Sequence, residues 1–249
     1  MMNVISIINH KGGVGKTTTT LNLGAALAID GKRVLMIDLD GQANLTISAG
    51  IKNTTKTIYE AFRGDIEKLP ILSNKEELHI VPASLDLQAL EAELMGEPGR
   101  ELILKDLLSS IESEYDIVLI DCPPALGFLT LNALTASSHV LIPVEAEALA
   151  LKGMTKLLQV VAKVQKRLNP QLSILGIVVT KYDSRKVLNR NVHDSIQKDY
   201  PDFLMKTVIR DNVSLAEAPA IQMDVLHYSP KSYGSLDYTA LAQEITTIL

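Results

Sequence analysis

The sequence predicts an α/β fold in which a doubly wound, mostly parallel sheet is flanked by helices. Apolar runs without strict alternation, such as residues 33–38, are typical of strands that are buried on both faces of a sheet. Helical patterns alternate with these runs along the chain, as in other layered α/β folds. A glycine-rich segment, residues 11–18, lies between the first apolar run and the first helical pattern.

The expected elements follow from these patterns in chain order. Strands are expected near residues 3–9, 33–38, 78–81, 116–121, 139–144, 173–180 and 204–209. Helices are expected near residues 16–30, 84–94, 100–113, 129–137, 151–168, 187–199 and 235–248. Of the 249 residues, 47% are hydrophobic, and no linker, repeat or low-complexity tract interrupts them. We therefore expect one domain over residues 1–249.

Residues 11–18 read Lys-Gly-Gly-Val-Gly-Lys-Thr-Thr and are expected to bind phosphate. Glycines let consecutive backbone N–H groups turn toward an anion, and the following helix adds its unpaired N–H groups and positive dipole end. Lys16 is expected to reach the β- and γ-phosphates, and Thr17 to bind Mg²⁺ through its hydroxyl. The predicted nucleotide-binding residues of this loop are Lys11, Gly12, Gly13, Val14, Gly15, Lys16, Thr17 and Thr18.

A second lysine, Lys11, precedes Lys16 in this loop. The pattern G-x-x-x-x-G-K-[ST] is not met, because position 10 is histidine. Two ammonium groups over one triphosphate are one possibility for this pair. The other is that Lys11 points away from its own site, toward a second molecule.

Three aspartates stand at or just after the ends of expected strands, where ligand sites lie in α/β sheets. We assign Asp121 to Mg²⁺, Asp38 to the outer shell of the metal, and Asp40 to orienting the attacking water. Each could instead be an ordinary capping or turn aspartate.

These segments together resemble the ParA family of partition ATPases, within the deviant Walker A group of P-loop proteins. The resemblance covers almost the whole chain. Its motifs are Lys11-Gly-Gly-Val-Gly-Lys16-Thr-Thr, Asp38-Leu-Asp40-Gly-Gln-Ala-Asn44, Asp121-Cys-Pro-Pro124, Leu131-Asn-Ala-Leu134, Ile142-Pro-Val144 and Asn212-Val-Ser-Leu-Ala-Glu-Ala-Pro219.

The resemblance implies an ATPase that requires Mg²⁺ and forms a face-to-face homodimer when ATP is bound. Lys11 of each subunit would reach the other subunit's nucleotide, so that Lys11, Lys16 and Asp40 would be catalytic. Asn212 would lie in the loop that holds adenine. The resemblance also implies binding to double-stranded DNA without sequence preference, and a ParB-type partner that triggers hydrolysis and release.

Several residues depart from the family pattern. Gly41 replaces a proline, and His10 stands where glutamine is common. Asp211 and Ser214 replace two arginines, and Tyr233 replaces a basic residue. The second of those arginines usually belongs to the surface that faces DNA, so the DNA contacts of this chain are expected to differ.

The candidates for DNA contact are basic residues in the last third of the chain. Residues 149–181 contain no acidic residue, and their basic side chains up to residue 167 fall on one helical stripe opposite an apolar side. A solvated helix face is the alternative to a phosphate-binding face. The predicted DNA-binding residues are Lys152, Lys156, Lys163, Arg167, Arg185, Lys186, Arg190 and Lys231.

Composition limits the remaining alternatives. One cysteine excludes an internal disulfide and disfavours a subunit-bridging iron–sulfur cluster, and five scattered histidines do not suggest a metal site. We expect no signal peptide, no membrane span and a cytoplasmic, nucleoid-associated protein. The last helix lacks lysine and arginine, which disfavours a MinD-like membrane anchor. A ParA-like ATPase that positions a protein cargo, a MinD-like positioning ATPase and a metabolic kinase or ligase remain alternatives.

Overall fold

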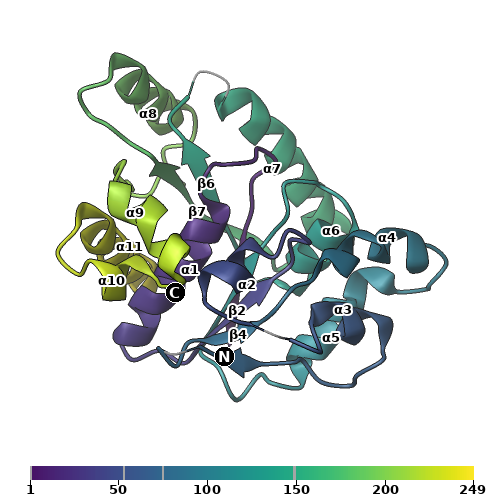
Figure 1. Cartoon of the computed structure of the whole chain (residues 1–249). Helices are drawn as coiled ribbons and strands as arrows, with labels where there is room; N and C mark the ends of the chain where they lie inside the picture. Colours follow the sequence, from purple (N-terminus) through teal and green to yellow (C-terminus); the bar gives the residue numbers. More distant parts are fainter. Residues whose placement is uncertain (1, 53, 75, 148–149) are drawn as a thin grey trace.

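The computed structural model of the chain describes residues 2–52, 54–74, 76–147 and 150–249, with the side chains of residues 150–152 outside this description. In the described chain, seven strands form one sheet in the order β3-β4-β2-β5-β1-β6-β7 (Figure 1). The strands are β1 (Asn3–Ile7), β2 (Val34–Asp38), β3 (Leu72–Ser73), β4 (His79–Val81), β5 (Ile117–Asp121), β6 (His139–Glu145) and β7 (Ser173–Thr180). All neighbouring strands run parallel except β3 and β4, which confirms the predicted sheet.

Helices cover both faces of the sheet. The α-helices are α1 (Lys16–Ile29), α2 (Asn44–Ser48), α3 (Ile58–Arg63), α4 (Leu90–Glu93), α5 (Ile103–Ser109), α6 (Phe128–Ala136), α7 (Ala150–Arg167), α8 (Val187–Asp199), α9 (Val213–Glu217), α10 (Val225–Tyr228) and α11 (Tyr233–Ile248). Short 3-10 helices in the described ranges are η1 (Leu85–Gln88), η2 (Arg100–Leu102) and η3 (Ala218–Ile221). None of the described helices is both long and apolar enough to span a bilayer.

The central strands are buried on both faces, which explains their uninterrupted apolar sequences. Along β5, Ile117 and Leu119 pack with α1, α10 and α11, whereas Val118 and Ile120 pack with α3, α5, α6 and α7. Successive side chains of a strand point to opposite faces, so a strand between two helical layers needs apolar residues at every position. The two cores therefore share the same sheet, with one layer of helices on each side (Figure 1).

The prediction of a strand at residues 204–209 is wrong. This segment runs beside the edge strand β7 and forms only isolated bridges, one between Leu204 and Ile177 of β7 and one between Arg210 and Tyr182, just after β7. Between these bridges the backbone N–H groups of Lys206 and Thr207 donate to the Glu244 carboxylate of α11, at 2.7 and 2.9 Å. A regular ladder cannot form where the backbone donors are used by a side chain.

The segment after α8 packs closely on β7 at Gly176. A Cβ atom at this position would overlap the Met205 side chain and would lie 3.2 Å from the Phe203 carbonyl oxygen. Because an added atom would have to push a backbone carbonyl away, the edge of the sheet needs a glycine here.

We predict that Gly176→Ala lowers the free energy of unfolding by about 1–3 kcal/mol, because overpacking forces Phe203 and Met205 away from β7. Urea denaturation followed by circular dichroism measures this change. Gly96→Ala is the matched control, because a Cβ atom there would meet nothing within 4 Å. Equal stability of the two variants would contradict the close packing at β7.

Candidate functional site

The segment between β1 and α1 forms a concave loop at the carboxyl end of the sheet. Gly13 and Gly15 have φ angles of +78° and +90°, in the left-handed region that favours glycine. Helix α1 starts directly after Gly15 with no side-chain cap and no acidic residue in its first turn. Its first backbone N–H groups are therefore available to an anion, as the sequence predicted for a phosphate site.

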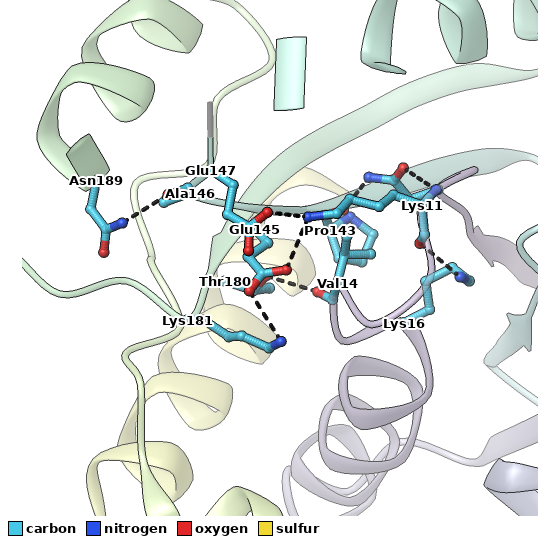
Figure 2. Close-up of polar contacts among 11 residues, drawn as sticks. Lys11, Val14, Lys16, Pro143, Glu145, Ala146, Glu147, Thr180, Lys181 and Asn189 are labelled. Atoms are coloured by element: carbon cyan, nitrogen blue, oxygen red, sulfur yellow. Dashed lines mark hydrogen bonds and ion pairs between the residues drawn. The ribbon is translucent and has the colours of Figure 1, made fainter. Parts of the chain in front are cut away.

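The two lysines of the loop point to different places. Lys16 is 8% exposed, and its ammonium donates to the Lys11 carbonyl oxygen at 3.4 Å, over the loop itself. The Lys11 ammonium lies 2.5 Å from a carboxylate oxygen of Glu147 and 3.4 Å from one of Glu145, beyond the end of β6 (Figure 2). Lys16 thus covers the anion cradle, whereas Lys11 is directed away from it.

Two buried carboxyl groups end neighbouring strands beside the loop. Asp38 and Asp121 are register partners at the ends of β2 and β5. Asp121 accepts a hydrogen bond from the Thr17 hydroxyl at 2.7 Å, while its Oδ1 is buried without a partner in the described chain. Asp38 accepts hydrogen bonds from the backbone N–H of Asp40 and from both the backbone N–H and hydroxyl of Thr46.

Burial shifts both carboxyl groups toward the protonated form. It raises the pKa of Asp38 from 3.8 to about 6, against the opposing hydrogen bonds from Thr46. Burial, together with the charge of Asp38, raises the pKa of Asp121 well above its ordinary value. Two adjacent carboxylates without a cation are unfavourable, and a bound cation would allow both to ionise.

The oxygen atoms at this place fit a magnesium ion. Mg²⁺ prefers oxygen ligands and usually keeps waters and phosphate oxygens, so it needs only one or two protein groups. The Thr17 hydroxyl and the unpartnered Oδ1 of Asp121 are such groups, adjacent to the cradle. Among the described residues, no cluster of three or more His, Cys, Asp or Glu side chains is arranged to hold a metal.

Asp40 lies on the loop after β2, at a cavity between two loops. Its Oδ1 accepts the backbone N–H of Gln42 at 3.0 Å. The cavity has a volume of ≈350 Å³ and is lined by Asp40, Gly41 and Gln42 on one side and by Pro123 and Pro124 on the other. The loops that follow β2 and β5 therefore face each other across open space.

A second cavity, of ≈200 Å³, adjoins the start of α1 and is suited to a nucleoside. Gly15 and Thr18 line it from the loop side, Thr180 from β7, and Asn212 and Tyr238 from the C-terminal region. Its accessible lining is mainly apolar, as expected where a base packs. The structure thus brings Asn212 next to the predicted phosphate loop.

Contacts that the sequence analysis did not predict hold the loop in place. The buried Asn9 donates to the Pro143 carbonyl of β6 at 2.7 Å and accepts the Lys11 backbone N–H at 3.0 Å. The Thr180 hydroxyl donates to the Val14 carbonyl at 2.8 Å. Glu145 was also missed, although it ends a strand as Asp38 and Asp121 do, so the criterion that selected those two aspartates also selects it.

His10 connects the loop to the start of α7. A Cβ atom at Gly153, in the first turn of α7, would overlap the His10 ring. The His10 Nδ1 atom is buried and has no hydrogen-bond partner among the described residues. The residue before Lys11 is therefore in direct contact with the basic helix.

The predicted DNA-binding residues fall into two different electrostatic environments. On α7, the exposed Lys156, Lys163 and Arg167 form no ion pair with any described residue, while the Lys152 side chain lies outside the description. No acidic residue occurs within α7.

The basic residues near α8 are instead paired locally. Arg185 forms two hydrogen bonds of 2.9 Å with the Asp183 carboxylate, which lowers the pKa of Asp183 to about 2. Lys186 lies 4.0 Å from Asp211, and Arg190 donates to the Ser184 carbonyl oxygen. Lys231 is exposed on the connection between α10 and α11.

Tyr233, which stands where the family has a basic residue, contacts an arginine that is itself paired with an acid. The Arg210 guanidinium lies 3.9 Å from the centre of the Tyr233 ring and pairs with the Asp237 carboxylate of α11. Asp237 is 7% exposed, so the charge of Arg210 is paired with a buried carboxylate of the same chain.

Comparisons with known proteins agree with this geometry. A family model described as an AAA domain matches residues 2–174. The chain is 43% identical to the sporulation initiation inhibitor protein Soj of Bacillus subtilis, with 98% of each chain covered. It is 41% identical to the chromosome-partitioning ATPase Soj of Treponema pallidum, over 98% of this chain and 97% of that one.

A solved structure gives the same fold with a nucleotide in place. The cobyrinic acid a,c-diamide synthase of Mycobacterium smegmatis, with a bound ATP analogue and magnesium, superimposes with a TM-score of 0.87 at 36% identity. The match covers 98% of this chain and 93% of that one. The loop residues of this chain predicted phosphate and Mg²⁺, and the family resemblance implied ATP; that solved structure holds an ATP analogue and magnesium in the same fold.

We predict that the nucleotide-free chain becomes less stable as the pH rises from 4 through 6. The raised pKa of Asp38 means that the folded chain binds more protons than the unfolded chain in this range, so the free energy of unfolding falls with pH, by about 2 kcal/mol between about pH 4 and 6 for this group alone. Urea denaturation at several pH values, without Mg²⁺, measures the slope. Asp121→Asn should make the slope of stability against pH shallower, since it removes one of the two carboxyl groups whose pKa is raised. If the free energy of unfolding of the wild type did not change with pH in this range, the raised pKa values of Asp38 and Asp121 would be contradicted.

Proposed function

The chain belongs to the Soj/ParA family of P-loop ATPases. We propose that it is a dimerising switch that partitions chromosome or plasmid DNA. Two subunits that hold Mg²⁺ and ATP associate face to face and bind DNA without sequence preference. A ParB-type partner then triggers hydrolysis to ADP and phosphate, which separates the subunits. Such a protein works in the cytoplasm, at the nucleoid.

The observation that carries this proposal is the direction of Lys11. The cradle already has a lysine, because the Lys16 ammonium lies over the loop within 3.4 Å of the Lys11 carbonyl. The Lys11 ammonium is outside the cradle and half-exposed, so it can meet a charge on another molecule. A γ-phosphate presented by a second subunit supplies such a charge, and a two-fold axis makes the exchange reciprocal.

Within one subunit, the loop residues divide the tasks of phosphoryl transfer. The N–H groups at the start of α1 and the Lys16 ammonium would hold the phosphates. Thr17 and Asp121 would hold Mg²⁺, which would supply positive charge to the phosphate oxygens. Asp40 orients the attacking water from the loop after β2. Asp38 supports this arrangement through the backbone of the same loop.

We place the main DNA contact on the outer face of α7. Its exposed lysines and arginine are not neutralised by described residues, whereas Arg185 is paired with Asp183 and Arg210 with Asp237. Unpaired cations release more counterions when they meet phosphates, and this release provides non-specific affinity. The outer face of α7 would thus supply the positive charge that this chain lacks at Asp211 and Ser214, where the family pattern has arginines.

We predict that Asp40→Ala binds ATP and accumulates as a dimer, because only the attacking water loses its orienting carboxylate. Size-exclusion chromatography with light scattering, with ATP and with ADP, measures the dimer. Lys16→Ala is the comparison and should lose nucleotide binding in calorimetry, since the phosphates lose their counter-charge. An Asp40→Ala chain that hydrolyses ATP at the wild-type rate would assign the water to another residue.

We predict that ATP-dependent DNA binding falls with salt along a log–log slope of about −3.6 if α7 neutralises four phosphates, which is a loss of about a hundredfold between 50 and 200 mM. Fluorescence anisotropy with duplexes of unrelated sequence measures it. Lys163→Glu should weaken binding to all of them, whereas Arg185→Glu, at an already paired site, should change it less. A larger loss of affinity in Arg185→Glu than in Lys163→Glu would move the main DNA contact to the segment that precedes α8.

A further inference from the structure

Two glutamates at the end of β6 hold Lys11 on its own subunit. The Glu147 carboxylate lies 2.5 Å from the Lys11 ammonium and the Glu145 carboxylate 3.4 Å from it. Glu145 also pairs with Lys181, at 3.1 Å. Figure 2 shows the Lys11 side chain extended toward both carboxylates, while Lys16 stays at the loop.

Rigid elements determine the positions of these groups. Glu145 is the last residue of β6, in register with Thr180 of β7, and its side chain is only 16% exposed. The next residue, Ala146, is buried, and its carbonyl accepts a hydrogen bond of 2.8 Å from Asn189 of α8. The backbone of Lys11 is held by Asn9, which is itself bonded to β6.

The same ammonium cannot remain with these carboxylates and also cross to another subunit. We propose that Glu145 and Glu147 are positioning residues that retain Lys11 in the nucleotide-free subunit and so set the protein concentration at which the ATP-bound dimer forms. This rests on the proposed function, in which Lys11 meets the neighbour's nucleotide. The contact with Glu147 is also the largest cause of the raised pKa of Lys11.

The size of the effect follows from exposure and symmetry. The Lys11 and Glu147 side chains are 37% and 52% exposed, and exposed ion pairs of this kind change an equilibrium by a factor of about 1.4 to 5. A symmetric dimer must release two such pairs. The factor is therefore squared, to about 2- to 30-fold in the dimerisation constant.

The test compares Glu147→Gln with Glu93→Gln. Both remove one exposed carboxylate from an ion pair, but Glu93 pairs with Arg63, on α3, and not with Lys11. Glu145 is left intact, because it also holds Lys181 at the nucleoside cavity. Sedimentation velocity with Mg²⁺ and a non-hydrolysable ATP analogue, over a series of protein concentrations, measures the dimerisation constant.

We expect Glu147→Gln to dimerise at a concentration about 2- to 30-fold lower than the wild type, and Glu93→Gln to match the wild type. A weaker dimer in Glu147→Gln would overturn the proposal, because the carboxylate would then act within the dimer. An equally tighter dimer in both variants would also overturn the proposal, since the change would then follow from net charge and not from the release of Lys11.

A second measurement needs no dimer. Acylation of Lys11 by an amine reagent, followed by peptide mass spectrometry without nucleotide, should be about 1.4- to 5-fold faster in Glu147→Gln than in Glu93→Gln, because the released ammonium loses protons more readily. An unchanged rate would show that Glu147 does not hold Lys11. A wild-type chain that binds the analogue and stays monomeric would instead contradict the dimer of the proposed function, whatever the acylation rates are.

Discussion

The parallel pairing of β1, β2 and β5 is the constraint on which the site depends. The register aligns Ile7 with Asp121 and Asp121 with Asp38, so the three strands end in one row. The loop after β1, the acid of β5 and the acid of β2 are adjacent because the strands share one direction and one end point. A shift of one residue in any pair would turn a carboxyl group from this edge into the apolar core.

This constraint explains how much of the molecule could be predicted from the sequence. Buried strands with acids at their ends are visible as patterns, so the sheet and the places of Lys16, Thr17 and Asp121 could be anticipated. Short helices such as α2 could not, because Asp38 stabilises α2 by accepting hydrogen bonds from Thr46, a contact made only once β2 is in the sheet. Tertiary context overrides local preference in such segments.

Other features depended on which charged groups meet in space. The sequence shows Arg185 and Asp183 as near neighbours, but it does not show that the two are bound to each other while the cations of α7 have no described partner. The same holds for Glu145 and Glu147, which are more than 130 residues from Lys11 along the chain. Net charge and local composition cannot report such pairings, because they depend on distances of a few ångströms.

The contact between His10 and Gly153 restricts how this sequence can diverge. Since a methyl group at 153 would occupy the volume of the imidazole, any larger residue there requires a smaller or differently oriented one at position 10. The two positions are expected to covary among close homologues, although they lie on separate elements. A residue of another shape at position 10 would change what fits at 153, so grafts between family members need to carry both residues together.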